Sequence, residues 1–591
     1  MKRISCCFRL LVLGILIVLV SGCGMALPKT PKVIADWSRG KNLGQTRNNL
    51  PVSVVWQDES IYLTWVAQNE AAIHFMALDT MGNTLVELDL PLTTQRPREP
   101  HLFPAGVGEL HLLYLDNPKI PRAVFYTHLS RNGDILVQPV RISTLDVEAE
   151  SVVAAPGPDG ELDVFWTTED KSTGGLYHVR VDGLGTVTSD STLIAPAGGK
   201  PHLQVDRQGR IHLVWVQEST LYQNDVYYAV FDPATGLLYA RTLVGRFSTG
   251  TGLIAYGPVL GLDNQNAYVF WALEKRGGGL TAGGAETWYV TFPLSQPAYR
   301  EPVRLTIPGA MKPDYQSAKG AFTYERLAYR SPDPGAIYGD TDFLYMPSVV
   351  PGQHAELALF LSGKFSTRTH SSVDVVAAYL EAGTLKGYQI AARTSSNSMR
   401  PVATADDASN LHLVWISPGG FGRYEVYYAS TRTDVKGNFD RRTLSDVVGD
   451  LLGSVWSIAP ALGFFPPILL VWAFPSFVFV VVYYITQLEG GLDRRGPRVA
   501  LVIAIGLYLF AKLFLMPSVL FYSPLLDMMP RQYEALAIVA VPLLTFLISC
   551  GALVIYYKRS EYPTLFGSYL IFILTDTMLS LLIYVPTMLV S

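Results

Sequence analysis

Cysteine is scarce in this 591-residue chain, and its four copies lie near the two ends. They are Cys6, Cys7, Cys23 and Cys550, so the whole interval between the last two holds none. A domain in this interval contains neither a disulfide nor a cysteine-ligated metal. Its stability must come from the burial of apolar side chains, which a domain of this size can supply.

Charge is also low, because charged residues make up 16% of the chain and the formal net charge is −4. The sequence therefore lacks the concentrated basic surface that nucleic-acid binding needs. Hydrophobic residues make up 49%, but they are unevenly spread. Residues from about 30 to 445 have the composition of a soluble β protein rich in Gly, Pro, Tyr and Trp, whereas residues after about 453 form long apolar runs.

Motifs of common catalytic sites are missing from the β-rich part, which has no His-x-Glu-x-x-His spacing, no phosphate loop and no nucleophile elbow. The glycine clusters at 277–279 and 283–284 lack the lysine of a phosphate-binding loop, so they indicate a hairpin loop. We expect no cofactor and no metal.

The N-terminus has the features of an export signal. Lys2, Arg3 and Arg9 form a basic start, and residues 10–20 are apolar apart from one glycine. Residues 20–23, Val-Ser-Gly-Cys, resemble the lipobox of bacterial lipoproteins, and this resemblance implies acylation of Cys23. The alternative is an uncleaved signal anchor. In both cases residues 1–23 direct the β domain to export, and residues 24–49 are expected to be a linker.

Membrane-spanning helices are predicted in the C-terminal domain, residues 451–591, because crossing the hydrocarbon core takes about 20 apolar residues. Four segments qualify, at about 464–486, 499–521, 535–557 and 563–589. The loops after the first and third segments are rich in Arg and Lys, whereas the middle loop carries only Arg531. The positive-inside rule therefore predicts a multi-pass protein of a bacterial cytoplasmic membrane with the β domain on the extracytoplasmic side.

Two charged residues, Lys512 and Asp576, interrupt these apolar runs. Each stands 14 residues beyond a cytoplasmic-side marker, Arg498 or Tyr562, so both lie about 21 Å along their helices. Because an isolated charge in lipid is costly, we predict a Lys512–Asp576 pair. A proton or ion path is the alternative use of these residues.

A repeated phrase that ends in an aromatic residue predicts the fold of the β domain. Its copies occupy residues 61–65, 110–114, 162–166, 211–215, 267–271 and 411–415, with a weaker copy at 356–360. The spacing of the final aromatics is 49 to 56 residues except for one interval of 89, which indicates an insertion at about 308–345. A proline precedes the final aromatic of most copies by 13 or 14 residues and is expected at the start of each unit's first strand. Units of about 50 residues with three or four strands predict an all-β propeller over residues 50–447, with seven blades favoured and six or eight as alternatives.

The turn at Asp206–Gly209 and the Leu-His-Leu-Val-Trp phrase at 411–415 resemble the sialidase-like, BNR-type propeller repeats of exported bacterial proteins. The resemblance covers about 50–445 and implies the architecture alone. The Asp-box Ser-x-Asp-x-Gly-x-x-Trp and the Phe-Arg-Ile-Pro element are both absent. No catalytic residue is therefore carried over. His111, His212 and His412 recur at one repeat position, which indicates repeat consensus rather than a metal site.

Two regions are predicted to bind ligands. The first is the central mouth, where the residues that precede the prolines should lie together with nearby charged residues: Leu50, Arg96, Arg98, Glu99, Glu150, Lys200 and Arg400. The second is the insertion, where tyrosines alternate with charges, as at Asp314, Tyr324, Arg326 and Arg330. Rings that stack and charges that orient suit a carbohydrate or peptide ligand.

These features favour a membrane-anchored recognition or scaffold module for envelope glycans or proteins, without enzymatic activity. Four helices exceed what anchoring requires, which indicates another membrane protein as a partner. The first alternative is a sialidase-like glycoside hydrolase, for which Glu99, Glu150, Asp314 and Tyr324 are the candidate catalytic residues. The second is a transport or signalling component that uses the helical domain.

Overall fold

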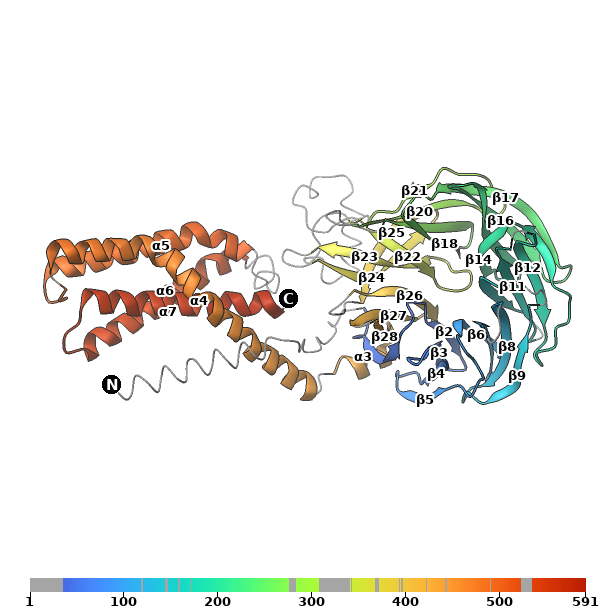
Figure 1. Ribbon diagram of the computed structural model, residues 1–591, viewed down its shortest axis with the longest axis horizontal. Coiled ribbons are helices and arrows are strands. Elements are labelled where there is room, and N and C mark those ends of the chain that lie inside the picture. Colours follow the sequence, from blue (N-terminus) through green and yellow to red (C-terminus); the bar gives the residue numbers. More distant parts are fainter. Residues whose placement is uncertain are drawn as a thin grey trace. The chain divides into compact units, whose positions relative to one another are not determined.

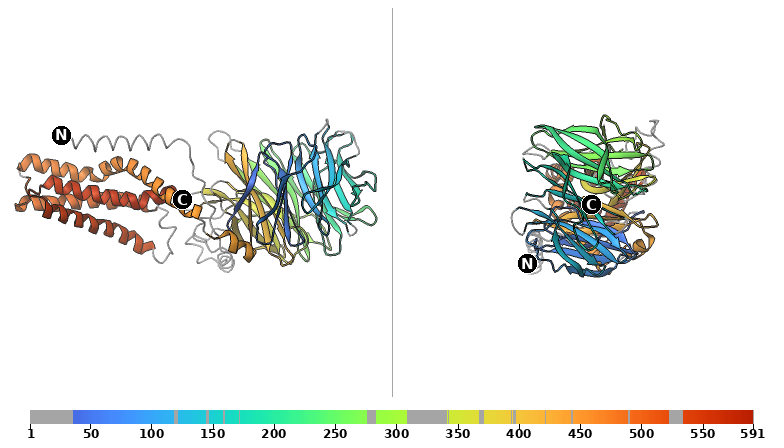
Figure 2. Two further views of the ribbon diagram at one scale, coloured as in Figure 1. Left: turned by 90° about the horizontal axis from the view of Figure 1, so that it is seen from below. Right: turned by 90° about the vertical axis from the view of Figure 1, so that its right-hand side faces the viewer.

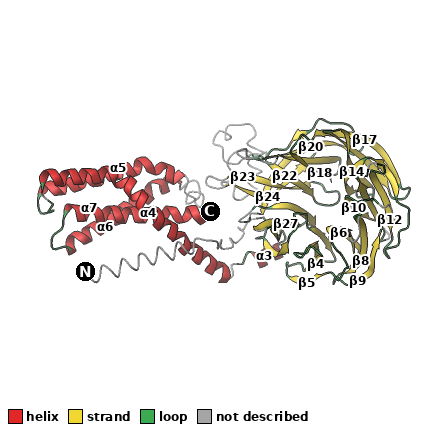
Figure 3. Cartoon of the chain, in the orientation of Figure 1, coloured by secondary structure: helices red, strands yellow, loops and turns green. Residues whose placement is uncertain are grey.

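The computed structural model describes residues 36–590 except 118–120, 144–146, 158–159, 171, 276–282, 308–340, 342, 367–370, 393, 395–396, 421, 442–443, 489 and 522–533. The expected export signal with Cys23 lies outside the described residues. The chain forms two compact units, a β unit that ends at Arg441 and a helical unit after it. Figure 3 shows strands concentrated in the first unit and helices in the second.

The β unit is a propeller of seven four-stranded antiparallel sheets, or blades, as the repeat predicts. Blade 1 contains β2 (Ser53–Gln57), β3 (Ser60–Val66), β4 (Ile73–Leu78) and β5 (Thr84–Asp89). Blade 2 contains β6 (Arg98–Gly106), β7 (Glu109–Asp116), β8 (Ala123–Ser130) and β9 (Ile135–Arg141). Blade 3 contains β10 (Ser151–Pro156), β11 (Leu162–Thr168), β12 (Gly175–Val181) and β13 (Thr192–Pro196). Blades 4 and 5 contain β14 (Gly198–Val205), β15 (Ile211–Thr220), β16 (Gln223–Asp232) and β17 (Leu237–Ser248); and β18 (Leu253–Leu262), β19 (Asn266–Lys275), β20 (Gly284–Pro293) and β21 (Val303–Arg304). Blades 6 and 7 contain β22 (Leu344–Val349), β23 (Leu357–Ser366), β24 (Ser371–Glu381) and β25 (Thr384–Ala392); and β26 (Met399–Ala405), β27 (Leu411–Gly420), β28 (Arg423–Ser430) and β1 (Lys41–Thr46).

The blades close into a ring. Each innermost strand contacts the innermost strand of the next blade, and β26 of blade 7 contacts β2 of blade 1. In Figure 1 the chain colour runs once round the ring, so the orange β27 and β28 lie beside the blue β2 and β3. Figure 2 shows the same strands from two further sides.

The outer strand of blade 7 comes from the N-terminal side of the propeller. The sequence predicts a linker over residues 24–49, but Lys41–Thr46 instead form β1, which pairs antiparallel with β28. Trp37, just before β1, is fully buried in the core between blades 6 and 7. This segment escapes the repeat pattern because it supplies a single strand to a blade whose other three strands lie about 360 residues later.

Five of the six prolines that mark the units lie inside the innermost strands, whereas Pro51 precedes β2 by two residues. In blades 2, 4, 5, 6 and 7 the pairing with the second strand shifts in register around Pro100, Pro201, Pro258, Pro347 and Pro401. The expectation that these prolines start the strands is therefore wrong. A bulge accommodates proline because a residue at the bulge is released from the hydrogen-bonded ladder.

The recurrent histidines have a structural role within the repeat. His212 Nδ1 lies 2.6 Å from the Tyr228 hydroxyl, and its Nε2 lies 3.0 Å from Asp206 Oδ2 in the preceding turn. The equivalent His111 and His412 each bond a tyrosine of the third strand in the same way. These bonds tie the turn and two strands of one blade together, as repeat consensus requires. Within the described residues, no group of three or more His, Cys, Asp or Glu side chains is placed so that it could hold a metal ion.

The propeller has two faces, which we name by the path of the chain. The mouth face is where the innermost strands begin, and the exit face is where they end. Because the strands alternate in direction, the loops between second and third strands also lie on the mouth face. The chain leaves the propeller on the exit face, through the short helix α3 (Thr433–Phe439) after β28.

The helical unit contains α4 (Leu444–Gln487), α5 (Arg495–Phe521), α6 (Glu534–Arg559) and α7 (Leu565–Val590). Each is long and apolar enough to cross a membrane, as predicted. The membrane-length spans are Phe465–Gln487, Arg495–Phe514, Val539–Arg559 and Leu565–Ile583. Helix α4 begins 20 residues before the expected start at 464, so Pro466 and Pro467 lie within the helix and not at its first turn.

Candidate functional site

In five of the seven blades, the bulge of the innermost strand places one residue at the mouth in a left-handed backbone conformation. Glu99, Lys200, Met346 and Arg400 have φ values of 48°, 51°, 55° and 54°, and Gly257 takes the same place in blade 5. For a residue other than glycine this conformation costs about 1–3 kcal/mol, and such strain concentrates at functional sites. Four strained positions in one ring make the mouth the candidate site.

Arg400 lies at the centre of this group. Its guanidinium carbon stands 5.2 Å from the ring centroid of Tyr256, and its Nε donates a hydrogen bond to Asn49 Oδ1 at 3.4 Å. The Tyr256 hydroxyl donates to Glu274 Oε2, and the ring of Tyr345 approaches the Tyr256 ring edge-on at 6.3 Å. Strands of blades 5, 6 and 7 thus bring a cation, a carboxylate and two aromatic rings together.

Glu99 adds a second carboxylate from blade 2. Burial raises the pKa of Glu99, although the positive charges of Arg400 and Arg98 oppose this shift. Burial lowers the pKa of the Arg400 guanidinium, and the neighbouring Tyr256, Glu99 and Glu274 act in the opposite direction. Burial, with a smaller effect of Glu274, raises the pKa of Tyr345 to about 12, so this hydroxyl is protonated at neutral pH.

Two histidines come directly after the bulges of blades 2 and 4 in the innermost strands. Burial lowers the pKa of His101 to about 4, and burial together with His101 lowers the pKa of His202 to about 4. The neutral His202 accepts a hydrogen bond at Nδ1 from the Leu260 amide at 3.2 Å. These rings therefore contribute polar atoms without charge at neutral pH.

The other predicted mouth residues form a charged rim. Glu150 lies 3.4 Å from Arg122, whose guanidinium also contacts Glu148 at 2.7 Å. Arg96, Arg98 and Lys200 are exposed. Arg122 also contributes positive charge to the environment of Glu99, so blades 2 and 3 share this rim.

The predicted insertion residues Asp314, Tyr324, Arg326 and Arg330 lie outside the described residues. The segments that flank them are described, and Ile307 pairs with Thr341 through an antiparallel bridge. This bridge lies in the link between β21 of blade 5 and β22 of blade 6, where the chain passes along the mouth face.

Four residues of the mouth were not predicted from the sequence: Tyr256, Glu274, Tyr345 and Arg122. A signal was available for two of them, because Tyr256 and Tyr345 each stand two residues before a bulge proline, as Arg98 does. Glu274 carried no such signal, since it belongs to the second strand β19 and meets Tyr256 only through the register of β18 and β19.

Comparisons with known proteins add a fold likeness. No protein-family model and no curated protein match the chain. Among solved structures, an ulvan lyase of polysaccharide lyase family 25 bound to -[GlcA(1-4)Rha3S]- is 11% identical and covers 71% of this chain and 98% of its own, with a TM-score of 0.41. The polysaccharide lyase Uly1 is 11% identical and covers 66% of this chain and 90% of its own, with a TM-score of 0.38. A thermostable family-43 glycoside hydrolase is 12% identical and covers 45% and 96%, with a TM-score of 0.28. Likenesses this weak assign no activity and no site residue to the chain.

A second polar cluster lies inside the helical unit. Lys512 Nζ donates to Asp576 Oδ2 at 2.5 Å, to Ser580 Oγ at 2.8 Å and to Thr545 Oγ1 at 3.3 Å. The Tyr508 hydroxyl also donates to Asp576 Oδ2, at 2.7 Å. All three ammonium hydrogens of Lys512 have an acceptor, so the structure brings together the two charges that the sequence places at equal depth.

Proposed function

We propose that the mouth of the propeller binds a glycan that carries carboxylate groups. The observation that supports this most directly is the position of Arg400, which is half-buried, stacked on Tyr256 and held in a strained backbone conformation. Guanidinium groups bind carboxylates through paired hydrogen bonds, and aromatic rings give a sugar a surface on which to stack. The exposed Arg96, Arg98 and Lys200 add positive charge around the same opening.

We further infer that the helices hold the propeller on the extracytoplasmic side of a bacterial membrane. The lipobox-like end of the export signal and the Arg- and Lys-rich loops support this orientation. The glycan would then belong to the cell envelope or its surroundings. Labelling of single cysteines introduced at Arg131 and Arg559 in intact cells tests the orientation, since only the first should react with an impermeant reagent.

Recognition is favoured over catalysis because the Tyr256 hydroxyl, which would be the nucleophile of a hydrolase at this mouth, keeps its proton at neutral pH. Burial and the adjacent Glu274 raise the pKa of Tyr256 far above its usual range. A hydrolase is the second candidate, since a tyrosine hydrogen-bonded to a carboxylate has the arrangement of a nucleophile and its base. In that case Glu99, with its raised pKa, would serve as the acid.

Substitution Arg400→Met is expected to weaken binding of a hexamer of galacturonic acid about 10- to 100-fold, because it removes one charged hydrogen-bonding group. Calorimetry on the full-length protein in lipid nanodiscs measures this change. Arg207→Met, which removes an exposed arginine from the exit face, is the matched control and should bind as the wild type does.

Equal affinities of the Arg400→Met and wild-type proteins would contradict the proposal, provided that the two unfold at the same temperature. Arg98→Met, at the exposed rim, gives an independent and smaller loss of about 2- to 5-fold. Chromatography of the same mixtures detects shortened oligomers. Shortening that Tyr256→Phe abolishes would support the hydrolase instead.

Binding is expected to tighten as the pH falls from 7.5 to 5. Burial raises the pKa of Glu99, so a larger share of Glu99 than of an unperturbed glutamate becomes neutral as the pH falls, and neutral Glu99 no longer competes with the ligand carboxylate for Arg400. His101 and His202, with pKa values of about 4, stay neutral and do not contribute. The gain reaches at most about tenfold per pKa unit of coupling.

Substitution Glu99→Gln should hold the affinity near the value that the wild type reaches when Glu99 is protonated and remove most of the pH dependence. Burial also raises the pKa of Glu150, so we assign any small remaining pH dependence of the affinity to that residue. If Glu99→Gln left the pH dependence of the affinity unchanged, Glu99 would not face the ligand.

A further inference from the structure

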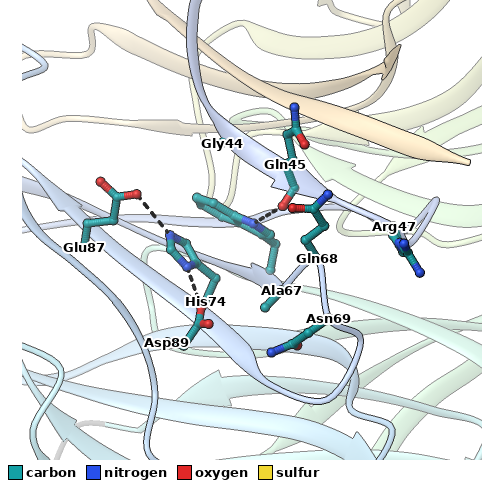
Figure 4. A pocket seen from close by; sticks show the side chains of 10 residues that line it. Gly44, Gln45, Arg47, Ala67, Gln68, Asn69, His74, Glu87 and Asp89 are labelled. Atoms are coloured by element: carbon teal, nitrogen blue, oxygen red, sulfur yellow. Dashed lines mark hydrogen bonds and ion pairs between the residues drawn. The ribbon is translucent and has the colours of Figure 1, made fainter. Parts of the chain in front are cut away.

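A groove of about 600 Å³ lies on blade 1, beside the end of β1 (Figure 4). Its volume falls within the range of about 300–1,000 Å³ that is typical of small-molecule sites. The floor is formed by Trp65 and His74, whose ring centroids are 4.5 Å apart. The Trp65 indole donates a hydrogen bond to the Gln45 carbonyl of β1 at 3.3 Å, and this bond links the floor to β1.

The walls of the groove carry polar groups that are free to bind a ligand. In the part of the chain that the structure describes, the side chains of Gln45, Arg47 and Gln68 take part in no hydrogen bond and are exposed. Asn69 accepts two bonds at Oδ1 from the amides of residues 71 and 72, at 3.0 and 3.1 Å, and its amide nitrogen stays available. The free groups include both donors and acceptors.

The groove carries charges of both signs. His74 lies between two carboxylates, with Nδ1 2.8 Å from Asp89 and Nε2 3.9 Å from Glu87, as Figure 4 shows. Arg47 lies on the other side of the opening. A site with amides, carboxylates and a guanidinium around an aromatic floor matches a hydroxyl-rich ligand, because each hydroxyl both donates and accepts.

A short loop joins this groove to the mouth. Arg47 lines the groove, and Asn49, two residues later, accepts the hydrogen bond from Arg400 Nε at 3.4 Å. Two residues span at most about 7 Å. The groove is formed by the β3–β4 loop and the end of β5, both of which lie on the mouth face.

We infer that the groove and the mouth are two subsites for one glycan chain. The mouth takes a carboxylate-bearing sugar, and the groove takes a hydroxyl-rich residue further along the same chain. This inference rests on the proposed function and extends it, because it makes the ligand a polysaccharide rather than a free sugar acid.

The test compares oligomers of two, four and six residues in which glucuronic acid alternates with a neutral N-acetylhexosamine, with the full-length protein in nanodiscs, so that the chain offers a carboxylate to the mouth and a neutral, hydroxyl-rich residue to the groove. We expect the hexamer to bind about tenfold more tightly than the dimer, since a longer chain can occupy both subsites at once. Arg47→Met and Gln68→Ala should each lower the hexamer affinity about 2- to 10-fold and leave the dimer affinity unchanged. Both side chains are exposed, so neither change should alter the unfolding temperature.

Equal affinities for dimer and hexamer would overturn the inference while the mouth proposal stands. The inference also fails if Arg47→Met weakens dimer and hexamer alike, or if it weakens neither. Absence of binding at every length would refute the mouth proposal itself, and the inference would fall with it. Arg207→Met on the exit face is again the matched control.

Discussion

Replacement of Trp37 by alanine is expected to lower the free energy of unfolding of the propeller by about 3–5 kcal/mol, the usual cost of removing a fully buried large aromatic side chain. The Trp37 ring packs edge-on against Phe360 at 5.9 Å, in the core that blades 6 and 7 share. Its indole nitrogen donates to Gln389 Oε1 at 2.9 Å, so the substitution also removes this hydrogen bond. Chemical denaturation of the full-length protein in nanodiscs measures the loss.

The position of Trp37 makes this substitution a test of how the ring is closed. The residue precedes β1, and its burial fixes the segment that completes blade 7. Tyr222→Ala is a suitable control, because this aromatic is 49% exposed and its loss should change stability by less than about 0.5 kcal/mol. A loss of less than about 1 kcal/mol for Trp37→Ala would mean that the N-terminal segment is not part of the ring.

Substitution Lys512→Met is expected to destabilise the helical unit by about 3 kcal/mol or more, because it leaves the buried Asp576 without its cation. Asp576 is fully buried and Lys512 is 1% exposed. The double substitution Lys512→Met and Asp576→Leu should recover most of the loss, since it removes both charges. Thermal unfolding in nanodiscs, monitored by the fluorescence of the helical unit, ranks the stabilities of the wild type, the single variant and the double variant.

Lys558→Met at the exposed end of α6 serves as the matched control and should be nearly neutral. If Lys512→Met were no more harmful than Lys558→Met, the pair would not hold the helices together. The network involves α5, α6 and α7 through Lys512, Thr545 and Asp576, so its loss should affect the packing of three helices together.

The sequence predicted the fold well where the structure is periodic. The aromatic phrase marks the second strand of each blade, and its regular spacing predicted the seven-bladed propeller. Strand β1 was missed because Lys41–Thr46 contains no aromatic residue and pairs with a strand nearly 400 positions away. Pairing over such a distance depends on the closure of the whole ring, which no local pattern encodes.

The site was less accessible to prediction. Proline identified where Glu99 and Arg400 stand, because a bulge tolerates proline and displaces the residue before it. The partners of Arg400 come from other blades, and Glu274 reaches Tyr256 only through strand register. A contact of this kind depends on three-dimensional closure, so composition and spacing alone do not reveal it.

The two ends of the ring meet on the exit face. The Ser38 amide donates to the Ser430 carbonyl at 2.8 Å, and the Arg39 amide donates to Asp440 Oδ1 at 2.8 Å. Tension applied to both chain ends together therefore draws β1 and β28 in the same direction and does not slide one along the other. The seam that closes the propeller is thus spared from shear, and neither chain end has to pass across the opening through which a glycan would enter.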